Sequence, residues 1–464
     1  MSKSYDLIVV GSGPGGYVAA IRASQLGMSV AVVEAAELGG ICLNWGCIPT
    51  KALLKSAQVF DYIKHAKDYG INVPEADVDF TAMITRSRTV AGGMSKGIEF
   101  LFKKNKIDLI QGFGKLTADK KLSVKDANGA NTIYEAKNII LATGGRAREL
   151  PNVKIDDKKI IGYRRAMFME KQPKKMVIMG SGAIGVEFAY FYNSIGTEVT
   201  IVEFLPRIVP NEDEDISKEL EKTYKKAGIN IMVNSSVESI DTAGEGCKVH
   251  IKTANGMQIV ECDVVLSAVG MTTNLEGIGL EEAGVKFEKG RVLVNDFSET
   301  NIKGIFAIGD ITHGPALAHV ASAEGIICVE KIAGHHPAPL NYANIPGCTY
   351  CQPEIASVGM TEKQAKEAGY EVKVGKFPFS ASGKASAAGV KGGFVKVIFD
   401  AKYGEWLGAH MIGANVTEMI AEVVVARNLE TTGHEIIKSV HPHPTMSEAI
   451  MEATAAAYGE VIHL

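Results

Sequence analysis

The sequence predicts an α/β protein with two Rossmann-like dinucleotide-binding units followed by a separate α+β domain. Three observations predict this fold class. The chain has 464 residues, which is too many for one hydrophobic core. A glycine-rich turn between an apolar strand and a helix occurs twice, beginning at Gly11 and at Gly180. From about residue 344, short strands alternate with amphipathic helices such as 417–427.

The two glycine turns share one pattern, in which a strand precedes the turn, a helix follows it, and an acid ends the next strand. The first glycine allows a tight bend, the second lets the backbone approach a pyrophosphate, and the third lets helix and strand pack closely. The phosphates then sit at the helix N-terminus, where free N–H groups favour negative charge. One such turn alone is weak support, but two in full context predict two dinucleotide sites. The glycines are Gly11, Gly13 and Gly16 in the first turn, and Gly180, Gly182 and Gly185 in the second.

The acids that end the second strand of each unit are Glu34 and Glu203. A carboxylate in this place accepts hydrogen bonds from ribose hydroxyls and repels a 2′-phosphate, by about 4 kcal/mol per unit charge at about 4 Å. We therefore expect NAD rather than NADP at the second site. Arg207, four positions beyond Glu203, is the one feature that weighs against this preference, and the less favoured alternative for Glu203 is a solvated strand end.

Two short segments favour FAD at the first site. Residues 139–145 read IILATGG, an apolar strand that ends in small residues and suits a nearby nucleotide. Residues 304–310 read GIFAIGD, where Asp310 after a buried strand suits a hydrogen bond to a ribityl hydroxyl. Neither segment is specific alone.

These features divide the chain into four parts. We expect a first FAD-binding part at 1–145, an NAD-binding domain at 146–272, a central domain that completes the FAD site at 273–343, and a C-terminal domain at 344–464. Within the first part, about 51–105 is predicted to be helical, and Asn128-Gly129 indicates a hairpin.

Composition limits the classes of protein that remain. Hydrophobic residues make up 46% and charged residues 22% of the chain, as in ordinary globular proteins. The net charge of -4 argues against nucleic-acid binding, which needs a basic surface. We expect no membrane span, because no uninterrupted apolar run reaches 18 residues. No signal or transit peptide is recognised, so we expect a reducing, cytoplasmic location; a mature mitochondrial protein fits the same pattern.

The sharpest motif is a pair of cysteines in residues 39–51, which read GGICLNWGCIPTK. Cys42 and Cys47 lie at a glycine-flanked helix start, where the helix N-terminus lowers a thiol's pKa. A bridge between them closes a very short loop and adds little stability, which favours a redox role. The alternative is two unlinked packing cysteines.

The other five cysteines are not interpreted as redox or metal-binding residues. Cys348 and Cys351 resemble a C-x-x-C motif, but positions i and i+3 of a strand face opposite sides. A second cysteine pair at zinc-ribbon spacing is missing, so we expect no metal site. We interpret the remaining three as buried small residues: Cys247, Cys262 and Cys328.

A general base is needed because a dithiol attacks as its thiolate. His443 has a suitable side chain, and Glu448 is placed to orient its imidazole. The prolines at 442 and 444 prevent a regular helix and can present the ring to a neighbour. By sequence alone, His441 and His443 are hard to separate.

Together these motifs resemble the class I pyridine nucleotide-disulfide oxidoreductases, most closely the dihydrolipoamide dehydrogenases, from near residue 5 to near residue 455. The resemblance implies a homodimer that uses FAD and NAD and takes the base of each active site from the partner subunit. It implies that residues 344–464 form the dimerisation domain. It selects His443, which directly precedes Pro-Thr-x-Ser-Glu, and leaves His441 as a packing or surface residue. Pro442 departs from the family, which carries a small non-proline residue there.

The resemblance also implies residue roles. Cys42 exchanges with the substrate, Cys47 lies against the flavin, and Lys51 lies near the flavin N5 with Glu187 as its salt-bridge partner. Val237 and Gly270 fall where the family contacts NAD. The positions that fall at FAD contacts are Gly114, Thr143, Gly144, Gly145, Asp310, Leu317, Ala318, His319 and Val320.

The implied reaction oxidises protein-bound dihydrolipoamide to lipoamide and reduces NAD. The implied partners are lipoyl domains and the acyltransferase core of 2-oxo acid dehydrogenase complexes, or the glycine cleavage system. Related glutathione reductases are disfavoured by the acidic approach to Cys42 at residues 34–38. Mercuric reductases carry a C-terminal cysteine pair, and soluble transhydrogenases lack paired redox cysteines. A rival from another class is a non-catalytic flavoprotein that senses NADH.

Overall fold

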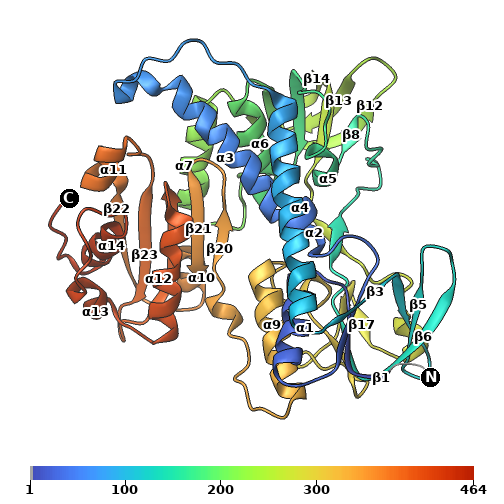
Figure 1. Cartoon of the computed structure of the whole chain (residues 1–464). Coiled ribbons are helices and arrows are strands. Elements are labelled where there is room, and N and C mark those ends of the chain that lie inside the picture. Colours follow the sequence, from blue (N-terminus) through green and yellow to red (C-terminus); the bar gives the residue numbers. More distant parts are fainter. Residues whose placement is uncertain (1–3) are drawn as a thin grey trace.

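The computed structural model describes residues 4–464 and divides them among three regions of the molecule. Figure 1 shows the N-terminal unit at lower right, the second unit above it in green, and the C-terminal unit at the left in orange and red. The two glycine-turn units therefore lie beside each other, and the C-terminal unit flanks them.

The first unit is built on a seven-stranded sheet in the order β3-β2-β1-β6-β5-β4, with β19 also paired to β6. Its strands β1, β2, β3, β6 and β19 are parallel, and Val9 stands between Val32 and Ile140. Strands β4, β5 and β6 form antiparallel pairs, which include the predicted Asn128-Gly129 hairpin. Apolar cores cover both faces of this sheet. The strands are β1 (Ser4–Val10), β2 (Val30–Glu34), β3 (Asp108–Gln111), β4 (Phe113–Leu116), β5 (Leu122–Lys125), β6 (Asn131–Leu141) and β19 (Ile305–Ala307).

The helices of the first unit include a break that the sequence did not predict. Instead of one helical region over 51–105, α3 ends at Lys64, and an irregular stretch follows Gly70, which has φ +74°. Asp79 then begins α4 by accepting a hydrogen bond from the N–H of Ala82. The helices are α1 (Pro14–Gln25), α2 (Gly40–Trp45), α3 (Cys47–Lys64), η1 (Ala66–Tyr69), α4 (Phe80–Lys104), η2 (Gly309–Ile311) and α9 (Ala318–Ile332).

The second unit has a parallel sheet in the order β11-β10-β9-β15-β8 and a separate three-stranded sheet of β12, β13 and β14. Its strands are β8 (Ile160–Ile161), β9 (Lys175–Met179), β10 (Glu198–Val202), β11 (Asn230–Met232), β12 (Ser236–Asp241), β13 (Cys247–Thr253), β14 (Gly256–Cys262) and β15 (Val264–Ser267). Its helices are α5 (Tyr163–Ala166), α6 (Ala183–Ser194) and α7 (Glu214–Lys226).

The chain enters and leaves the second unit through one antiparallel ribbon, formed by β7 (Gly145–Ala147) and β16 (Met271–Thr273). The predicted boundaries at 145 and 272 fall within these two strands, and the one at 343 falls within η3 (Tyr342–Asn344). The division into four parts stays a prediction. The connecting segment between β16 and β19 also holds α8 (Leu280–Ala283), β17 (Phe287–Glu288) and β18 (Arg291–Val292).

The C-terminal unit is an antiparallel sheet in the order β20-β21-β24-β23-β22 with helices packed on it. Every residue of β23 and β24 is buried, because α12 and α14 pack on these strands and α7 of the second unit also contacts β24. Its strands are β20 (Gly347–Thr349), β21 (Glu354–Gly359), β22 (Val372–Pro378), β23 (Phe394–Asp400) and β24 (Trp406–Gly413). Its helices are α10 (Glu362–Glu367), η4 (Phe379–Ala381), α11 (Gly383–Ala388), α12 (Val416–Asn428), α13 (Gly433–Lys438) and α14 (Glu448–Tyr458).

None of the helices within residues 4–464 combines the length and apolar character that a membrane crossing needs.

A buried lysine joins the C-terminal sheet to the second unit. The Lys396 side chain is only 4% exposed, and its Nζ lies 2.9 Å from Asp213, 3.1 Å from Asp215 and 2.8 Å from Glu362. Asp213 caps the N-terminus of α7, so this one ammonium group stabilises the contact between two units. Despite burial, these ion pairs raise the pKa of Lys396 and lower that of Asp213.

We expect Lys396→Ala to destabilise the protein by about 3 kcal/mol, because the buried Asp213 carboxylate then lacks its counter-charge. The measurement is the midpoint of thermal unfolding, followed by circular dichroism. Lys376→Ala is the matched control, since Lys376 is 45% exposed and 3.6 Å from Asp215; we expect less than about 1 kcal/mol there. Equal midpoints for the two variants would contradict the assigned role of Lys396.

Candidate active site

One large cavity of about 1510 Å³ lies where the three regions meet. Its walls come from the first glycine turn, the cysteine segment, the start of α6 and the segment that follows β20. The predicted positions that line it are Gly11, Gly13, Gly16, Glu34, Cys42, Cys47, Lys51, Gly114, Thr143, Gly144, Gly145, Glu187, Asp310, Leu317, Ala318 and His319. The fold therefore gathers into one space residues that are spread over more than 300 positions of sequence.

The backbone of the first glycine turn fits a pyrophosphate. Gly11 has φ +102°, and a side chain at Gly16 would place its Cβ 1.9 Å from the Gly11 carbonyl oxygen. At Gly13, by contrast, a Cβ would meet no atom within 4 Å, so this backbone faces open space at the N-terminus of α1. A phosphate can therefore approach free N–H groups there.

The acids Glu34 and Glu203 are bound to their glycine turns in the same way. Glu34 accepts hydrogen bonds from the N–H of Ser12 at 2.8 Å and from its hydroxyl at 2.6 Å. Glu203 accepts the equivalent pair from Ser181, at 2.9 and 2.6 Å. Each carboxylate therefore stabilises its turn, and its remaining lone pairs can accept hydroxyl hydrogens from a ribose.

The second glycine turn repeats the geometry of the first. Gly180 has φ +93°, and a Cβ at Gly185 would lie 2.1 Å from the Gly180 oxygen. Arg207 pairs with Glu214 at 3.1 Å and donates to the Pro210 carbonyl at 2.9 Å, so its charge is already engaged. Within the described chain, this turn borders α6 but supplies no wall of the large cavity. Among the described residues, the following predicted positions also do not line the large cavity: Gly182, Glu203, Val237, Gly270 and the core residue Val320.

The two cysteines of the motif lie on successive short helices, Cys42 in α2 and Cys47 at the first position of α3. Both are free thiols that hydrogen-bond each other. The bond with Cys42 and the nearby Lys51 ammonium lower the pKa of Cys47 to about 7, and the same bond together with burial raises the pKa of Cys42. The pair therefore contains one thiol that ionises near neutral pH and faces the cavity.

The predicted Lys51–Glu187 ion pair is present, with Nζ 2.9 Å from one carboxylate oxygen and 3.0 Å from the other. Sequence reasoning missed Tyr350, whose N–H donates to Glu187 at 2.9 Å. The Tyr350 ring centre lies 4.3 Å from the Lys51 Nζ, a cation–π contact. Tyr350 sits in the C-x-x-C segment, which therefore positions the ion pair.

The loop after β19 also fits a bound nucleotide. Asp310 lines the cavity, and burial raises the pKa of its carboxyl. Glu324 of α9 supports this loop from behind, because it accepts from the Gly309 N–H at 2.7 Å and from the Tyr342 hydroxyl at 2.6 Å. Glu324 and Tyr342 were not predicted, since nothing local in the sequence connects them to Gly309.

His443 and Glu448 form the predicted pair, with Nδ1 2.8 Å from Oε1. The other carboxylate oxygen accepts from the Thr445 N–H at 2.8 Å. Although burial acts to raise it, these two bonds hold the pKa of Glu448 below its ordinary value. His441 instead contacts Glu422 at 2.7 Å, and its side chain is only 7% exposed. The His443 ring is 77% exposed and far along the chain from the cavity lining, which within residues 4–464 ends at Tyr350.

Three further residues from the two cysteine segments differ in their relation to the large cavity. Trp45 lines the cavity, with the Arg164 guanidinium 3.6 Å from its ring centre. Cys348 also lines it, and Cys351 is buried. Among residues 4–464, no group of three or more His, Cys, Asp or Glu side chains is arranged to hold a metal ion.

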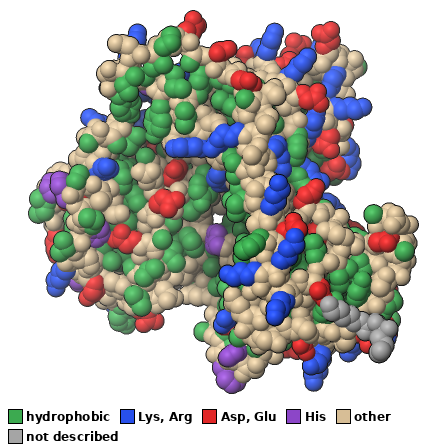
Figure 2. Space-filling view, viewed as in Figure 1, with side chains coloured by type: hydrophobic (Ala, Val, Ile, Leu, Met, Phe, Trp, Pro, Cys, Tyr) green, Lys and Arg blue, Asp and Glu red, His purple; other side chains and the backbone are tan. Residues whose placement is uncertain are grey.

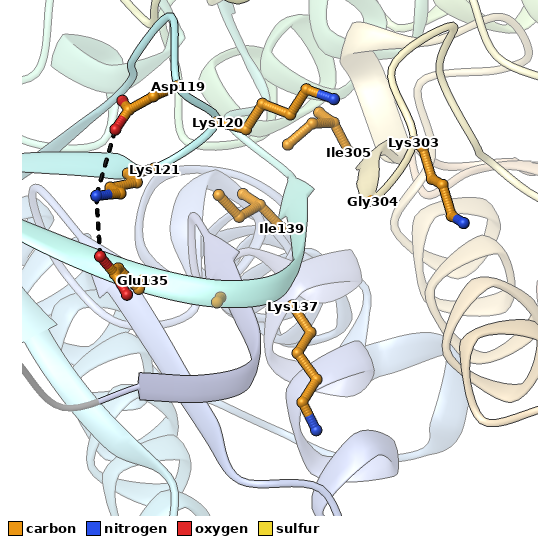
Figure 3. A pocket seen from close by; sticks show the side chains of 10 residues that line it. Asp119, Lys120, Lys121, Glu135, Lys137, Ile139, Lys303, Gly304 and Ile305 are labelled. Atoms are coloured by element: carbon orange, nitrogen blue, oxygen red, sulfur yellow. Dashed lines mark ion pairs between the residues drawn. The ribbon is translucent and has the colours of Figure 1, made fainter.

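A second, smaller hollow of about 290 Å³ lies at the edge of the first sheet (Figure 3). Lys121 there is paired with Asp119 and Glu135, at 3.3 and 2.9 Å. The ten residues that line it include no cysteine or histidine, so the redox chemistry belongs to the large cavity.

Comparisons with known proteins agree with this geometry. Residues 5–325 match the family described as "Pyridine nucleotide-disulphide oxidoreductase", and residues 345–454 match its dimerisation domain. The chain is 50% identical to the dihydrolipoyl dehydrogenase of Zymomonas mobilis and 49% identical to that of Rhizobium etli, over 100% of each chain. It is 42% identical to the mitochondrial dihydrolipoyl dehydrogenase 1 of Arabidopsis thaliana, over 100% of this chain and 92% of the relative.

Solved structures share the whole architecture. LpdA from Mycobacterium tuberculosis superposes with a TM-score of 0.91 at 26% identity, over 97% of this chain and 98% of that one. The HOCl-induced flavoprotein disulfide reductase RclA from Escherichia coli gives a TM-score of 0.88 at 25% identity, over 98% and 99%. With both glycine turns, the paired thiols and the His443–Glu448 pair in place, the chain belongs to the pyridine nucleotide-disulphide oxidoreductase family, within the branch of the dihydrolipoyl dehydrogenases.

Proposed function

We propose that this protein is an FAD- and NAD-dependent dihydrolipoyl dehydrogenase that oxidises protein-bound dihydrolipoamide to lipoamide. The observation that carries the proposal is the mutually hydrogen-bonded Cys42–Cys47 pair, which lies in one cavity with the Lys51–Glu187 ion pair and the first glycine turn. Bound FAD and NAD supply the electron and hydride chemistry. The chain itself supplies thiols, charges and a base.

The thiols do the exchange chemistry with the substrate. In the oxidised enzyme Cys42 and Cys47 form a disulfide, and one sulfur of dihydrolipoamide attacks the Cys42 sulfur and releases the Cys47 thiolate. The second substrate sulfur then displaces Cys42, so lipoamide leaves with its own disulfide and the enzyme keeps two thiols. The hydrogen bond with Cys42 and the Lys51 ammonium both stabilise the Cys47 thiolate and so lower its pKa.

His443 of the partner subunit removes the proton from the attacking substrate thiol. Two features support a base supplied across a dimer: the match to a dimerisation domain over 345–454, and the exposed His443 ring, which is not among the described residues that line the cavity of its own chain. Glu448 orients that ring through Nδ1, leaving Nε2 to face the substrate.

An exposed apolar patch at the end of α3 is suited to subunit contact. Figure 2 shows apolar side chains gathered at the upper left of the molecule, where this segment lies. Patches of this kind in a folded chain mark interaction surfaces. Its members are exposed by 36–58%: Val59, Tyr62, Ile63, Tyr69, Ile71 and Val73.

Glu203 favours NAD over NADP, because its buried carboxylate would repel a 2′-phosphate. Lipoyl domains and the acyltransferase core of a 2-oxo acid dehydrogenase complex are the proposed partners, by analogy with the relatives' activity. The rival function, non-catalytic NADH sensing, leaves the paired thiols unexplained.

The decisive assay compares initial rates of the FAD-loaded protein with dihydrolipoamide and NAD against glutathione disulfide and NADPH. We expect turnover with the first pair only, and its loss by at least about a thousandfold in Cys47→Ser, since the thiolate path is broken. Cys328→Ala, on the buried side of α9, is the control and should keep turnover within about twofold. Dihydrolipoamide-dependent NADH formation by Cys47→Ser would refute the scheme.

His443→Gln should lower kcat/KM for dihydrolipoamide by about 10²- to 10⁴-fold, because the attacking thiol loses its base. Mixed dimers of Cys47→Ser and His443→Gln subunits, purified through two different tags, test where the base comes from. If it comes from the partner, one site of each mixed dimer is intact, and we expect about half the wild-type rate. A base from the same chain would leave the mixed dimer inactive.

The pH dependence of the Cys47 thiol follows from its neighbours. Because its pKa is lowered to about 7, the thiolate is present above that pH and is lost as pH falls through it. Lys51→Met should move this midpoint upward by about one pH unit, as the stabilising charge is removed. Ultraviolet thiolate absorbance of the reduced protein measures it, with Lys55→Met on the exposed side of α3 as control. An unmoved midpoint would mean that Lys51 does not stabilise the thiolate.

A further inference from the structure

Two cysteines outside the active site face each other across a hairpin. Cys247 is the first residue of β13 and Cys262 the last of β14, and the register of the antiparallel pair sets them directly opposite each other. Opposed residues in antiparallel strands have Cα atoms about 4.5 or 5.5 Å apart. Both separations fall in the range of about 4.4 to 6.8 Å that a disulfide requires.

The Cys247 and Cys262 thiols share two properties with the active-site pair. Both are free, and they hydrogen-bond each other, as do Cys42 and Cys47. Cys247 is 2% and Cys262 6% exposed, and the Cys247 Sγ also lies 3.8 Å from the Lys159 carbonyl oxygen and 3.9 Å from that of Asp263. A bridge between them would therefore need little movement of the backbone.

The surroundings distinguish the two thiols. The hydrogen bond with Cys262 and the positive charge of Lys159 lower the pKa of Cys247, whereas the same bond and burial raise that of Cys262. The Lys159 ammonium is held beside this hairpin by the Thr242 carbonyl at 2.7 Å and by the Gly244 carbonyl. Cys247 is thus the thiol that ionises and attacks, and Cys262 the thiol that resolves.

We propose that Cys247 and Cys262 form an oxidation site separate from the redox centre, which closes to a cross-strand disulfide when the protein meets a peroxide. The Cys247 thiolate attacks one oxygen of hydrogen peroxide and becomes a sulfenic acid while hydroxide leaves. The Cys262 thiol then attacks that sulfur, and water leaves as the disulfide forms. The two cysteines lose two electrons in all, and the peroxide gains them.

The bridge would close the open end of the hairpin, whose other end is the turn from Thr253 to Gly256. Directly after Cys262, the Asp263 N–H donates to the Lys175 carbonyl of β9, the strand that leads into the second glycine turn. Oxidation therefore ties β13 to β14 within the three-stranded sheet, next to the point where the chain meets the sheet that carries the proposed NAD site. We expect amide exchange in β13 and β14 to slow by about tenfold on oxidation.

Peptide mapping of the FAD-loaded holoenzyme tests the proposal directly. The protein is treated with hydrogen peroxide, alkylated, and digested with trypsin without reduction. Cleavage after Lys248 and Lys252 separates the two cysteines, so a disulfide leaves two tryptic peptides linked. We expect this linked species, together with the Cys42–Cys47 disulfide as an internal measure of oxidation. Cys328 serves as the comparison, because burial raises the pKa of its thiol and it should be recovered reduced.

Two single variants test the order of the steps. In Cys262→Ser we expect a stable sulfenic acid at Cys247, trapped by dimedone. In Cys247→Ser we expect Cys262 to remain a thiol without an adduct. A wild-type digest with Cys42 and Cys47 linked but both hairpin cysteines alkylated would overturn the proposal, and an adduct at Cys262 would overturn the assigned roles. The mapping does not depend on turnover, so failure of the proposed activity would be seen separately.

Discussion

The ion pair between Lys51 and Glu187 joins the three regions of the molecule at one point. Lys51 belongs to α3 of the first unit, Glu187 to α6 of the second, and the Tyr350 N–H that also binds Glu187 comes from the C-terminal unit. The Glu187 side chain is only 6% exposed, so its charge is stable there only with these partners. The same lysine charge acts on Cys47. The interaction that holds the walls of the cavity together thus also contributes, with the hydrogen bond from Cys42, to the lowered pKa of the Cys47 thiol inside it.

The two dinucleotide-type units stabilise their glycine turns with the same groups. In each, a serine within the glycine turn donates twice to the acid at the end of the next strand. Such features are local, because glycine spacing, strand and acid lie within some 25 positions. The sequence therefore predicted both turns directly. The Lys51–Glu187 pair and the His443–Glu448 pair were predicted through the family resemblance.

What the sequence did not reveal depends on contacts between distant segments. The helical region predicted over 51–105 is broken near Gly70, and the spacing of apolar residues in the sequence does not indicate this break. The role of Tyr350 depends on how the C-terminal sheet packs against α3 and α6. Cys247 and Cys262 were predicted to be buried, which they are, but their opposition follows from a hairpin register that their spacing alone does not specify.

The β7–β16 ribbon makes the second unit an insertion within the first. The last strand of the first sheet, β19, pairs Ile305 with Ile139 of β6, so that sheet stays incomplete while the whole inserted unit is synthesised. At about 5–20 residues per second, a nascent chain waits roughly 10 to 30 seconds with the β6 edge uncovered. The inserted unit is contiguous and can fold during that interval. During translation, the edge of β6 that pairs with β19 therefore stays without its partner strand until the inserted unit has been made.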